Sequence, residues 1–218
     1  MKVIVGIDEV GRGSLAGPVT VCVVACEVRL YTKLKRDKKL PPLGKDSKKL
    51  SPTERQKYAK YLKSIMSRRH LDIYQGLPLV TLVNWVRFSY KVVHISNKII
   101  DSKGISFCIR RAIERELKKL KLDPRKTEVR LDGLLKAPKE FINQKTIIKG
   151  DEKEKIIAWA SILAKVSRDA LMCRMAKKYP KYGFEMHKGY GTAMHRKMIK
   201  KHGLSPIHRR SFCKNIKN

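Results

Sequence analysis

Cysteine patterns that would indicate a zinc site or a disulfide framework are missing from this sequence of 218 residues. The cysteines number five, an odd count, and none of them stands in a Cys-x-x-Cys pair or at the Cys/His spacing of zinc sites. They are unclustered and flanked mostly by apolar residues: Cys22, Cys26, Cys108, Cys173 and Cys213. We therefore expect reduced, buried thiols and a protein that resides in the cytoplasm.

Long hydrophobic runs are also missing. No stretch approaches the roughly 18 apolar residues of a membrane-spanning helix, and the N-terminus has no apolar core of the signal-peptide type. The sequence contains no internal repeat and no low-complexity tail. We expect a soluble protein with no membrane segment, long enough to bury the core of one domain.

Acidic residues are scarce. The chain has 19 Asp and Glu against 51 Lys and Arg, which gives a formal net charge of +32. Such a charge predicts a polyanionic partner, because basic side chains release counterions when they neutralise phosphates, and nucleic acid is the first candidate. The alternative is a proteome bias of the source organism, which the Lys-rich run 33–39 partly fits. The same charge disfavours self-association at low salt, so we expect a monomer.

Two of these few acids, Asp8 and Glu9, lie between the apolar run 3–7 and the turn Gly11-Arg12-Gly13. The run is apolar on both faces, as in a central strand that is covered on both sides. Carboxylates gain nothing at such a place unless a charged group binds there. A divalent cation with a phosphate as its other ligand is the economical explanation. The alternative is a strand end whose acids enter a solvated loop.

The remaining pattern predicts an α/β architecture. Expected strands are 19–28, antiparallel to the first, then 128–133 and 146–151, with further strands or a hairpin within 70–95. Expected helices are 51–67, 105–120, 154–178 and a short one near 193–201, and 31–49 is expected to be an exposed basic loop. The helix 154–178 has a face of small residues that allows close approach to a sheet: Ala158, Ala160, Ser161 and Ala164.

Acids recur at the ends of the predicted strands, at Asp8-Glu9, Asp132 and Asp151. The ends of neighbouring strands lie within about 10 Å of one another, so these carboxylates can converge. They would supply enough oxygen ligands for a two-metal site, with ions about 3.5–4 Å apart. Taken singly, Asp132-Gly133 and Gly150-Asp151 are each more often an ordinary turn, and it is their joint recurrence at strand ends that favours a site.

From about residue 3 to residue 212 the sequence resembles a known family, the type II ribonucleases H. The opening signature of that family is similar to the segment Gly6-Ile7-Asp8-Glu9-Val10-Gly11-Arg12-Gly13-Ser14-Leu15-Ala16-Gly17-Pro18. Further blocks in the same order resemble the family at Asp46–Leu50, Asp132-Gly133, Lys149–Asp151, Ala160–Asp169, Tyr182–Phe184, His187–Tyr190 and His208–Phe212.

The resemblance implies a ribonuclease H-like α/β fold, in which a mixed central sheet is flanked by helices and followed by a small helical C-terminal extension. We expect residues 1–178 to form the catalytic core and 179–218 a helical cap of the same domain. The implied activity is that of an endoribonuclease. It would hydrolyse the RNA strand of RNA/DNA hybrids and nick duplex DNA on the 5′ side of embedded ribonucleotides, leaving 3′-hydroxyl and 5′-phosphate ends.

The resemblance also implies roles for individual residues. Mg²⁺ or Mn²⁺ would be the cofactor, and the catalytic and metal-binding carboxylates would be Asp8, Glu9, Asp132 and Asp151. Asp169 is a further candidate metal ligand, and its alternative is a helical acid paired with Lys165 one turn earlier. Recognition of the 2′-hydroxyl, the group that distinguishes RNA from DNA, is implied for Gly11, Arg12 and Gly13. Tyr190 would stack on the next sugar, and phosphates would be held by Lys45, Ser47, Lys48 and Lys49.

The sequence departs from the family at a few places. Leu134 stands where the family often has asparagine, Trp159 where a small alanine is usual, and the stretch 77–87 has no assigned counterpart. Only Met1-Lys2 precede the first strand, which makes the related type III enzymes, with their N-terminal substrate-binding domain, a poorer match.

The sequence leaves two other functions open. One is a non-catalytic, basic nucleic-acid-binding protein, although such a surface would avoid acids where phosphates approach. The other is a different ribonuclease H-like nuclease such as a junction resolvase, which has no need for Gly11-Arg12-Gly13 together with Tyr190.

Overall fold

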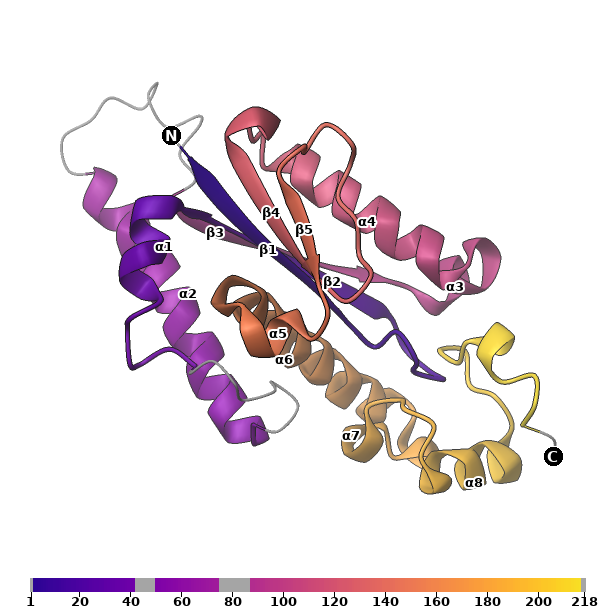
Figure 1. Cartoon of the computed structure of the whole chain (residues 1–218). Coiled ribbons are helices and arrows are strands. Elements are labelled where there is room, and N and C mark those ends of the chain that lie inside the picture. The colour runs from indigo at the N-terminus through magenta and orange to yellow at the C-terminus, as the bar shows by residue number, and fades with distance from the viewer. Residues whose placement is uncertain (1, 42–49, 75–86, 217–218) are drawn as a thin grey trace.

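The computed structural model describes residues 2–41, 50–74 and 87–216, with the backbone alone for 66–74. Its centre is one mixed sheet of five strands in the order β3-β2-β1-β4-β5 (Figure 1). The strands are β1 (Val3–Val10), β2 (Val19–Glu27), β3 (Phe88–Ile95), β4 (Thr127–Asp132) and β5 (Gln144–Ile147). β1 pairs antiparallel with β2 and parallel with β4, β2 pairs antiparallel with β3, and β4 pairs parallel with β5. The predicted mixed sheet is confirmed.

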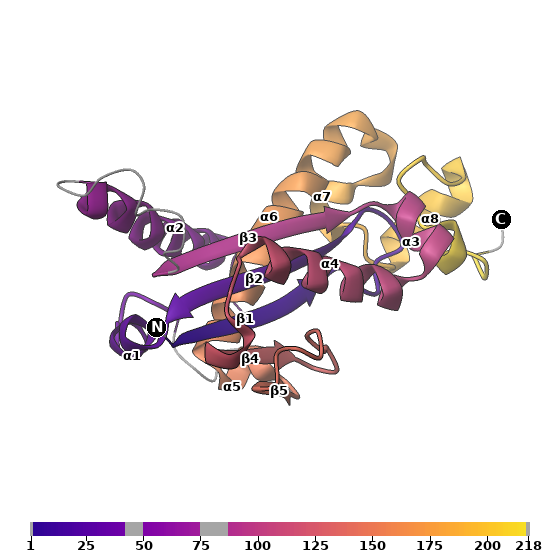
Figure 2. The same cartoon turned by 90° about the horizontal axis from the view of Figure 1, so that it is seen from above.

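Helices cover both faces of this sheet, as Figures 1 and 2 show. On one face lie α3 (Asn97–Lys103) and α4 (Ile105–Lys119), and on the other α1 (Val28–Leu34), α2 (Pro52–Tyr74) and the long α6 (Lys155–Lys178). The short elements are α5 (Gly150–Lys153), α7 (Phe184–His187), α8 (Ala193–His202) and three 3₁₀ turns at Pro124–Lys126, Pro180–Tyr182 and Arg210–Phe212.

β1 lies at the centre of the sheet and is buried on both faces, as its apolar sequence predicts. Val5 packs into the α4 side of the core and Ile4 into the α6 side. α6 approaches β1 so closely that a Cβ atom on Gly6 would lie 2.3 Å from the backbone oxygen of Ile156. The predicted face of small residues allows this approach, and Ala160 on it is completely buried. The close packing fixes α6 against the strand that carries Asp8.

Local details confirm one sequence prediction and account for one departure from the family pattern. The capping box at the start of α2 is formed, because Glu54 N–H donates to Ser51 Oγ (3.1 Å) and Ser51 N–H donates to a carboxylate oxygen of Glu54 (2.8 Å). Trp159, which departs from the family pattern, is completely buried and packs edge-on against Tyr31 and Phe88, with ring centroids 5.6 Å away in each case. Its bulk is therefore accommodated in the core beneath α1.

Other boundary predictions were wrong. Residues 31–34 belong to helix α1 rather than to a loop, because Leu30, Tyr31 and Leu34 recur at helical spacing and are buried. Residues 70–74 extend helix α2 instead of starting a strand, whereas 88–95 is a strand as expected. β5 ends at Ile147, so Asp151 lies in the first turn of α5 and not at a strand end. The part of the predicted strand region 70–95 that covers 75–86 lies outside the described residues.

The segment after α6 consists of short helices that pack against the C-terminal half of that helix. Tyr182 and Phe184 are buried in one cluster with Met172 and Ala176 of α6 and with Ala16. The division at residue 178 into core and cap stays a prediction. Within the part of the chain that the structure describes, no helix is long and apolar enough to span a membrane.

Candidate active site

Asp8 lies within β1, which continues past it to Val10, and its side chain is buried. One carboxylate oxygen accepts the Glu9 backbone N–H at 2.7 Å, and the Ser161 side chain of α6 also forms a hydrogen bond to Asp8. Burial raises the pKa of Asp8 well above its usual value, and the nearby charges of Glu9, Asp132 and Asp151 raise it further. The cluster thus concentrates negative charge in one place, which the Ser161 hydrogen bond offsets only in part.

Glu9 is the second acid of the pair. Burial raises its pKa, and the Arg12 guanidinium, 3.4 Å from Glu9 Oε1, acts against that rise. The other carboxylate oxygen, Oε2, is buried and has no hydrogen-bond partner among the described residues. A buried carboxylate oxygen without a partner is costly. This is the orphaned atom that a bound cation would satisfy.

The other two acids come from β4 and α5. Asp132 ends β4, next to β1 in the sheet, and one of its oxygens accepts the Gly150 backbone N–H at 2.6 Å. Asp151 follows directly in α5 and is buried. The turn before α5 thus brings Asp151 toward β1, although β5 ends earlier than the sequence predicts.

A cleft of about 490 Å³ opens over these acids. Besides three of the carboxylates it is lined by the loop after β1, by α2, by α6 and by the C-terminal segment: Asp8, Glu9, Val10, Gly11, Arg12, Gly13, Arg55, Asp132, Ser161, Lys165 and Tyr190. The structure therefore brings the predicted Gly11–Gly13 segment and Tyr190, far apart in sequence, to the same cleft as the carboxylates. Asp151 lies close enough to influence Asp8 but does not line the cleft.

The two glycines of the Gly11-Arg12-Gly13 turn differ in their surroundings. Gly11 has a positive φ of 87°, and a Cβ atom there would lie 2.2 Å from Arg168 Nε. A Cβ atom on Gly13 would meet nothing within 4 Å, because this residue faces open space. Only Gly13 thus fits the expectation of an open backbone, whereas Gly11 makes room for a buried arginine.

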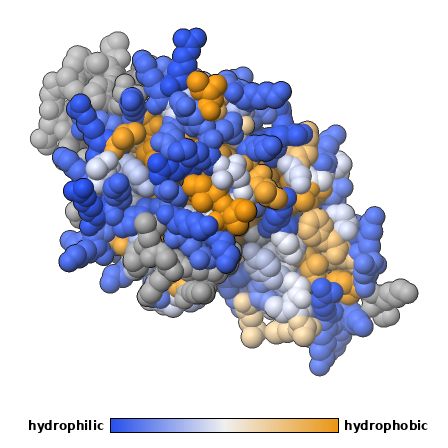
Figure 3. Space-filling view, viewed as in Figure 1, coloured by the Kyte–Doolittle hydropathy of each residue, from blue (hydrophilic) through white to orange (hydrophobic). Residues whose placement is uncertain are grey.

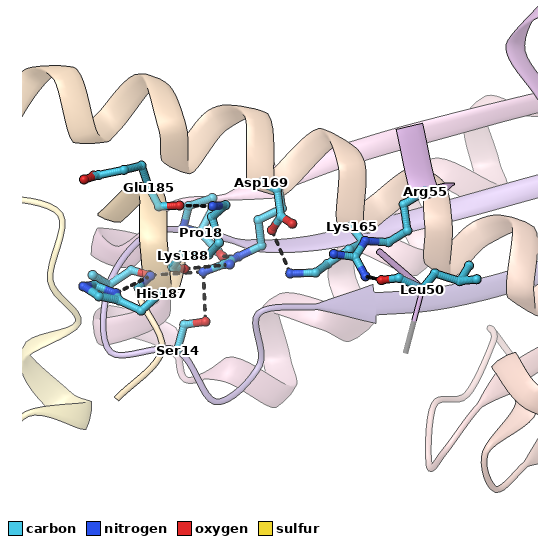
Figure 4. Close-up of polar contacts among 12 residues, drawn as sticks. Ser14, Pro18, Leu50, Arg55, Lys165, Asp169, Glu185, His187 and Lys188 are labelled. Carbon is cyan, nitrogen blue, oxygen red and sulfur yellow. Dashed lines mark hydrogen bonds and ion pairs between the residues drawn. The ribbon is translucent and has the colours of Figure 1, made fainter. Parts of the chain in front are cut away.

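Three polar residues that line the cleft were not among the predicted site residues: Arg55, Ser161 and Lys165. Ser161 was identified only as a small helical residue, Lys165 only as the alternative partner of Asp169, and no motif pointed to Arg55. Arg55 is buried and also donates to the Leu50 carbonyl oxygen. Lys165 lies 2.8 Å from Asp169 in an ion pair along α6, and Figure 4 shows both contacts. This pair fits the second interpretation of Asp169, which is absent from the cleft lining. The predicted phosphate-binding residues Lys45, Ser47, Lys48 and Lys49 lie outside the described residues.

The donor set of the site suits a hard divalent cation. Carboxylate oxygens without cysteine or histidine are the ligands that Mg²⁺ and Mn²⁺ prefer. Within residues 2–41, 50–74 and 87–216, no three acidic, histidine or cysteine side chains stand in an arrangement that could already hold an ion. The orphaned Glu9 Oε2 and the raised pKa of Asp8 are the observations that fit a cation in this site.

Among protein families, the model for ribonuclease HII matches residues 5–215 of this chain. The chain belongs to the ribonuclease HII family. It is 42% identical over 209 residues to the ribonuclease HII of Endomicrobium trichonymphae, which is 96% of this chain and 84% of that relative. It is 38% identical over 216 residues to the ribonuclease HII of Caldicellulosiruptor bescii, or 99% of this chain and 88% of that one. Family membership makes the protein a ribonuclease.

Solved structures agree on the fold. The ribonuclease H2 of Pyrococcus horikoshii is 23% identical with a TM-score of 0.67, covering 98% of this chain and 96% of its own. The RNase HII of Archaeoglobus fulgidus, solved in complex with PCNA, is 21% identical with a TM-score of 0.65, covering 99% and 97%. A Bst-RNase HIII in complex with Mn²⁺ has a TM-score of 0.58 at 17% identity, covering 93% of this chain and 63% of that one.

Proposed function

We propose that this ribonuclease is a metal-dependent endonuclease that cleaves the RNA strand of RNA/DNA hybrids and nicks duplex DNA on the 5′ side of embedded ribonucleotides. The products carry 3′-hydroxyl and 5′-phosphate ends. One observation carries the proposal: the carboxylates of Asp8, Glu9 and Asp132 share a single cleft with Gly13 and Tyr190, which are suited to contact a sugar.

Asp8, Glu9, Asp132 and Asp151 are the proposed ligands of Mg²⁺ or Mn²⁺. When bound, two such ions lower the pKa of an attacking water and stabilise the leaving oxygen of the scissile phosphate. Two of these carboxylates, those of Asp8 and Asp132, accept hydrogen bonds from the backbone N–H groups of Glu9 and Gly150. That support orients oxygens before substrate binds, which is what a site of this kind requires.

Basic side chains at the cleft have a separate task. Arg55 lines the cleft from α2 and Lys165 from α6. Guanidinium and ammonium groups there attract and position backbone phosphates but carry no information on the sugar. Arg12 is exposed and lies 3.4 Å from Glu9 Oε1. It adds a third positive charge to the cleft, in the loop that is proposed to contact the ribose.

Discrimination between RNA and DNA requires contact with the 2′-hydroxyl, the one group by which the sugars differ. The exposed Gly13 can approach a sugar closely, since a Cβ atom there would meet nothing within 4 Å. Tyr190 is half-buried on the opposite segment of the cleft, where its ring can pack on the neighbouring sugar. A purely binding protein would need neither feature beside a carboxylate cluster.

The proposed setting is the cytoplasm, and the proposed state is a monomer. All five cysteines are free, and only Cys173 is exposed, which suits a reducing compartment. Figure 3 shows one face of the molecule covered largely by hydrophilic side chains, with a smaller hydrophobic group near its middle.

The test is cleavage of a labelled RNA/DNA hybrid in Mg²⁺, in Mn²⁺ and in EDTA, with wild-type protein and the Asp8→Asn variant. We expect metal-dependent cleavage by the wild type, none in EDTA, and none by the variant, which should still bind the hybrid. Turnover by the variant comparable to wild type would refute the assigned role of Asp8. Salt-sensitive binding by the wild type without cleavage in either metal would favour the binding-protein alternative.

A further inference from the structure

Two arginines, Arg168 of α6 and Arg209 near the C-terminus, lie completely buried beneath the loop that follows β1. Neither guanidinium forms an ion pair with a carboxylate among the described residues. Burial lowers the pKa of Arg209 to about 10 and also lowers that of Arg168. A buried charge without a counter-ion is costly, so its hydrogen bonds must compensate for that cost.

Arg209 directs all of its hydrogen bonds to carbonyl oxygens of the loop. Its Nε donates to Gly17 at 3.0 Å, one terminal nitrogen donates to Arg12 at 2.8 Å, and the other donates to Gly11 at 2.7 Å. The planar guanidinium therefore joins the two ends of the loop to each other. Two of its three acceptors belong to the turn that the proposed function assigns to the 2′-hydroxyl.

Arg168 holds the same loop from α6. It donates to the carbonyl oxygens of Pro18 (2.9 Å) and Ala16 (3.2 Å) and to Ser14 Oγ (2.9 Å). A fourth hydrogen bond reaches the Lys188 carbonyl oxygen at 2.9 Å. Figure 4 shows Ser14, Pro18 and Lys188 gathered beside α6. Arg168 thus joins the loop to the segment that precedes Tyr190.

The guanidinium of Arg168 also lies 5.3 Å from the centre of the Tyr190 ring, in a cation–π arrangement. The loop itself is shaped around this arginine, because a side chain on Gly11 would overlap it. One buried group therefore contacts both parts of the cleft that are proposed to read the sugar. Neither arginine lines the cleft, so neither can contact the substrate.

We infer that Arg168 and Arg209 are positioning residues that hold the Gly11–Gly13 backbone and Tyr190 in the geometry that distinguishes a ribonucleotide from a deoxynucleotide. This inference rests on the proposed function. Its physical basis is preorganisation: a loop fixed before binding loses less entropy when the substrate binds, and its contacts with one hydroxyl stay within hydrogen-bonding distance. Lysine keeps the charge but cannot satisfy three or four acceptors in different directions.

The test compares Arg168→Lys and Arg209→Lys with wild type by a binding-selectivity ratio. The ratio is the Kd for an all-DNA duplex divided by the Kd for the same duplex with one ribonucleotide, measured in EDTA at fixed salt. We expect each variant to lower the ratio by about tenfold, or to near one if wild type starts lower, which is the scale of one lost hydrogen bond. The Kd for all-DNA duplex, which reports phosphate contacts, should stay within about twofold.

Arg196→Lys is the matched control, because the exposed Arg196 also donates through Nε to a backbone oxygen, but to that of Gly191 rather than to one of the loop. It should keep the wild-type ratio. A merely structural role would lower the folded fraction and weaken binding to both duplexes equally, which leaves the ratio unchanged.

Ser14→Ala tests the inference even if a lysine variant fails to fold. It removes one hydrogen-bond acceptor of Arg168 from the loop and leaves the arginine in place. It should lower the ratio by a few-fold with unchanged all-DNA affinity. A wild-type ratio in Ser14→Ala and in every lysine variant that folds would overturn the inference. A wild-type protein with a ratio of one and no cleavage at ribonucleotides would instead overturn the proposed function.

Discussion

Asp8→Asn should stabilise the metal-free protein while it abolishes cleavage. The Asp8 carboxylate is 4% exposed and faces three other acids, so in the absence of a cation its ionised form is unfavourable in the folded state. Asparagine has nearly the same shape, and its carbonyl oxygen can still accept the Glu9 N–H. The substitution therefore removes a buried charge and leaves the packing in place.

The sign follows from the link between pKa and stability, because a carboxyl group whose pKa is raised by folding lowers the stability of the folded state once it must ionise. We expect Asp8→Asn to raise the free energy of unfolding at pH 7.5 in EDTA by about 1–2 kcal/mol, the scale of a typical stabilising substitution. For a domain of this size that raises Tm by about 2–8 °C. Because the pKa is raised on folding, the unfavourable contribution grows as pH rises through the folded pKa. The gain should therefore disappear toward pH 4.

The assay is urea unfolding or thermal unfolding in EDTA and again with saturating Mg²⁺ or Mn²⁺. Cation binding stabilises a folded state that alone holds the ion. Wild type should gain stability on metal addition, and the variant should gain much less. A variant less stable than wild type in EDTA, or an equal gain from metal in both proteins, would refute the view that Asp8 belongs to an uncompensated metal site.

Three further predictions concern the surroundings of the site. Burial lowers the pKa of both His195 and His208 to about 4. As the pH falls from 6.5 to 4, each imidazole is therefore protonated in the unfolded state before the folded one, and each should lower the free energy of unfolding by up to about 1.4 kcal/mol per pH unit. An NMR titration of either imidazole near pH 6.5 in the folded protein would contradict this. Gly6→Ala should cost about 2–3 kcal/mol by forcing α6 away from β1, and an unchanged urea midpoint would show that the contact is not tight. Ser51→Ala should cost about 1 kcal/mol through loss of the capping box, with no effect on the metal-induced rise in Tm; a loss under 0.3 kcal/mol would contradict a formed cap.

Sequence alone predicted the sheet and its centre because hydrophobic periodicity records burial directly. The apolar run of β1, the small-residue face of α6 and the capping box before α2 are local patterns, and each is confirmed in the structure. Predictions failed where a local pattern was short or ambiguous. Tyr31 and Leu34, for example, are too few to distinguish a single amphipathic turn from a loop until the sheet buries them.

The site was predictable in its carboxylates but not in its supports. Acids at strand ends and the family motifs pointed to Asp8 and Asp132, since such residues stand out in a basic chain. Burial of Arg168 was not predictable, because an arginine in a helix of a protein with net charge +32 normally faces solvent. Its place depends on acceptors more than 150 residues away in sequence, such as the Ser14 hydroxyl.

The most direct test of the central claim is cleavage of a labelled DNA duplex with a single ribonucleotide, mapped at nucleotide resolution in Mg²⁺ or Mn²⁺, beside an all-DNA duplex of the same sequence. The account predicts one metal-dependent nick on the 5′ side of the ribonucleotide that moves when the ribonucleotide is moved, and no nick in the control. Cleavage of both duplexes at the same positions, or of neither, would contradict it.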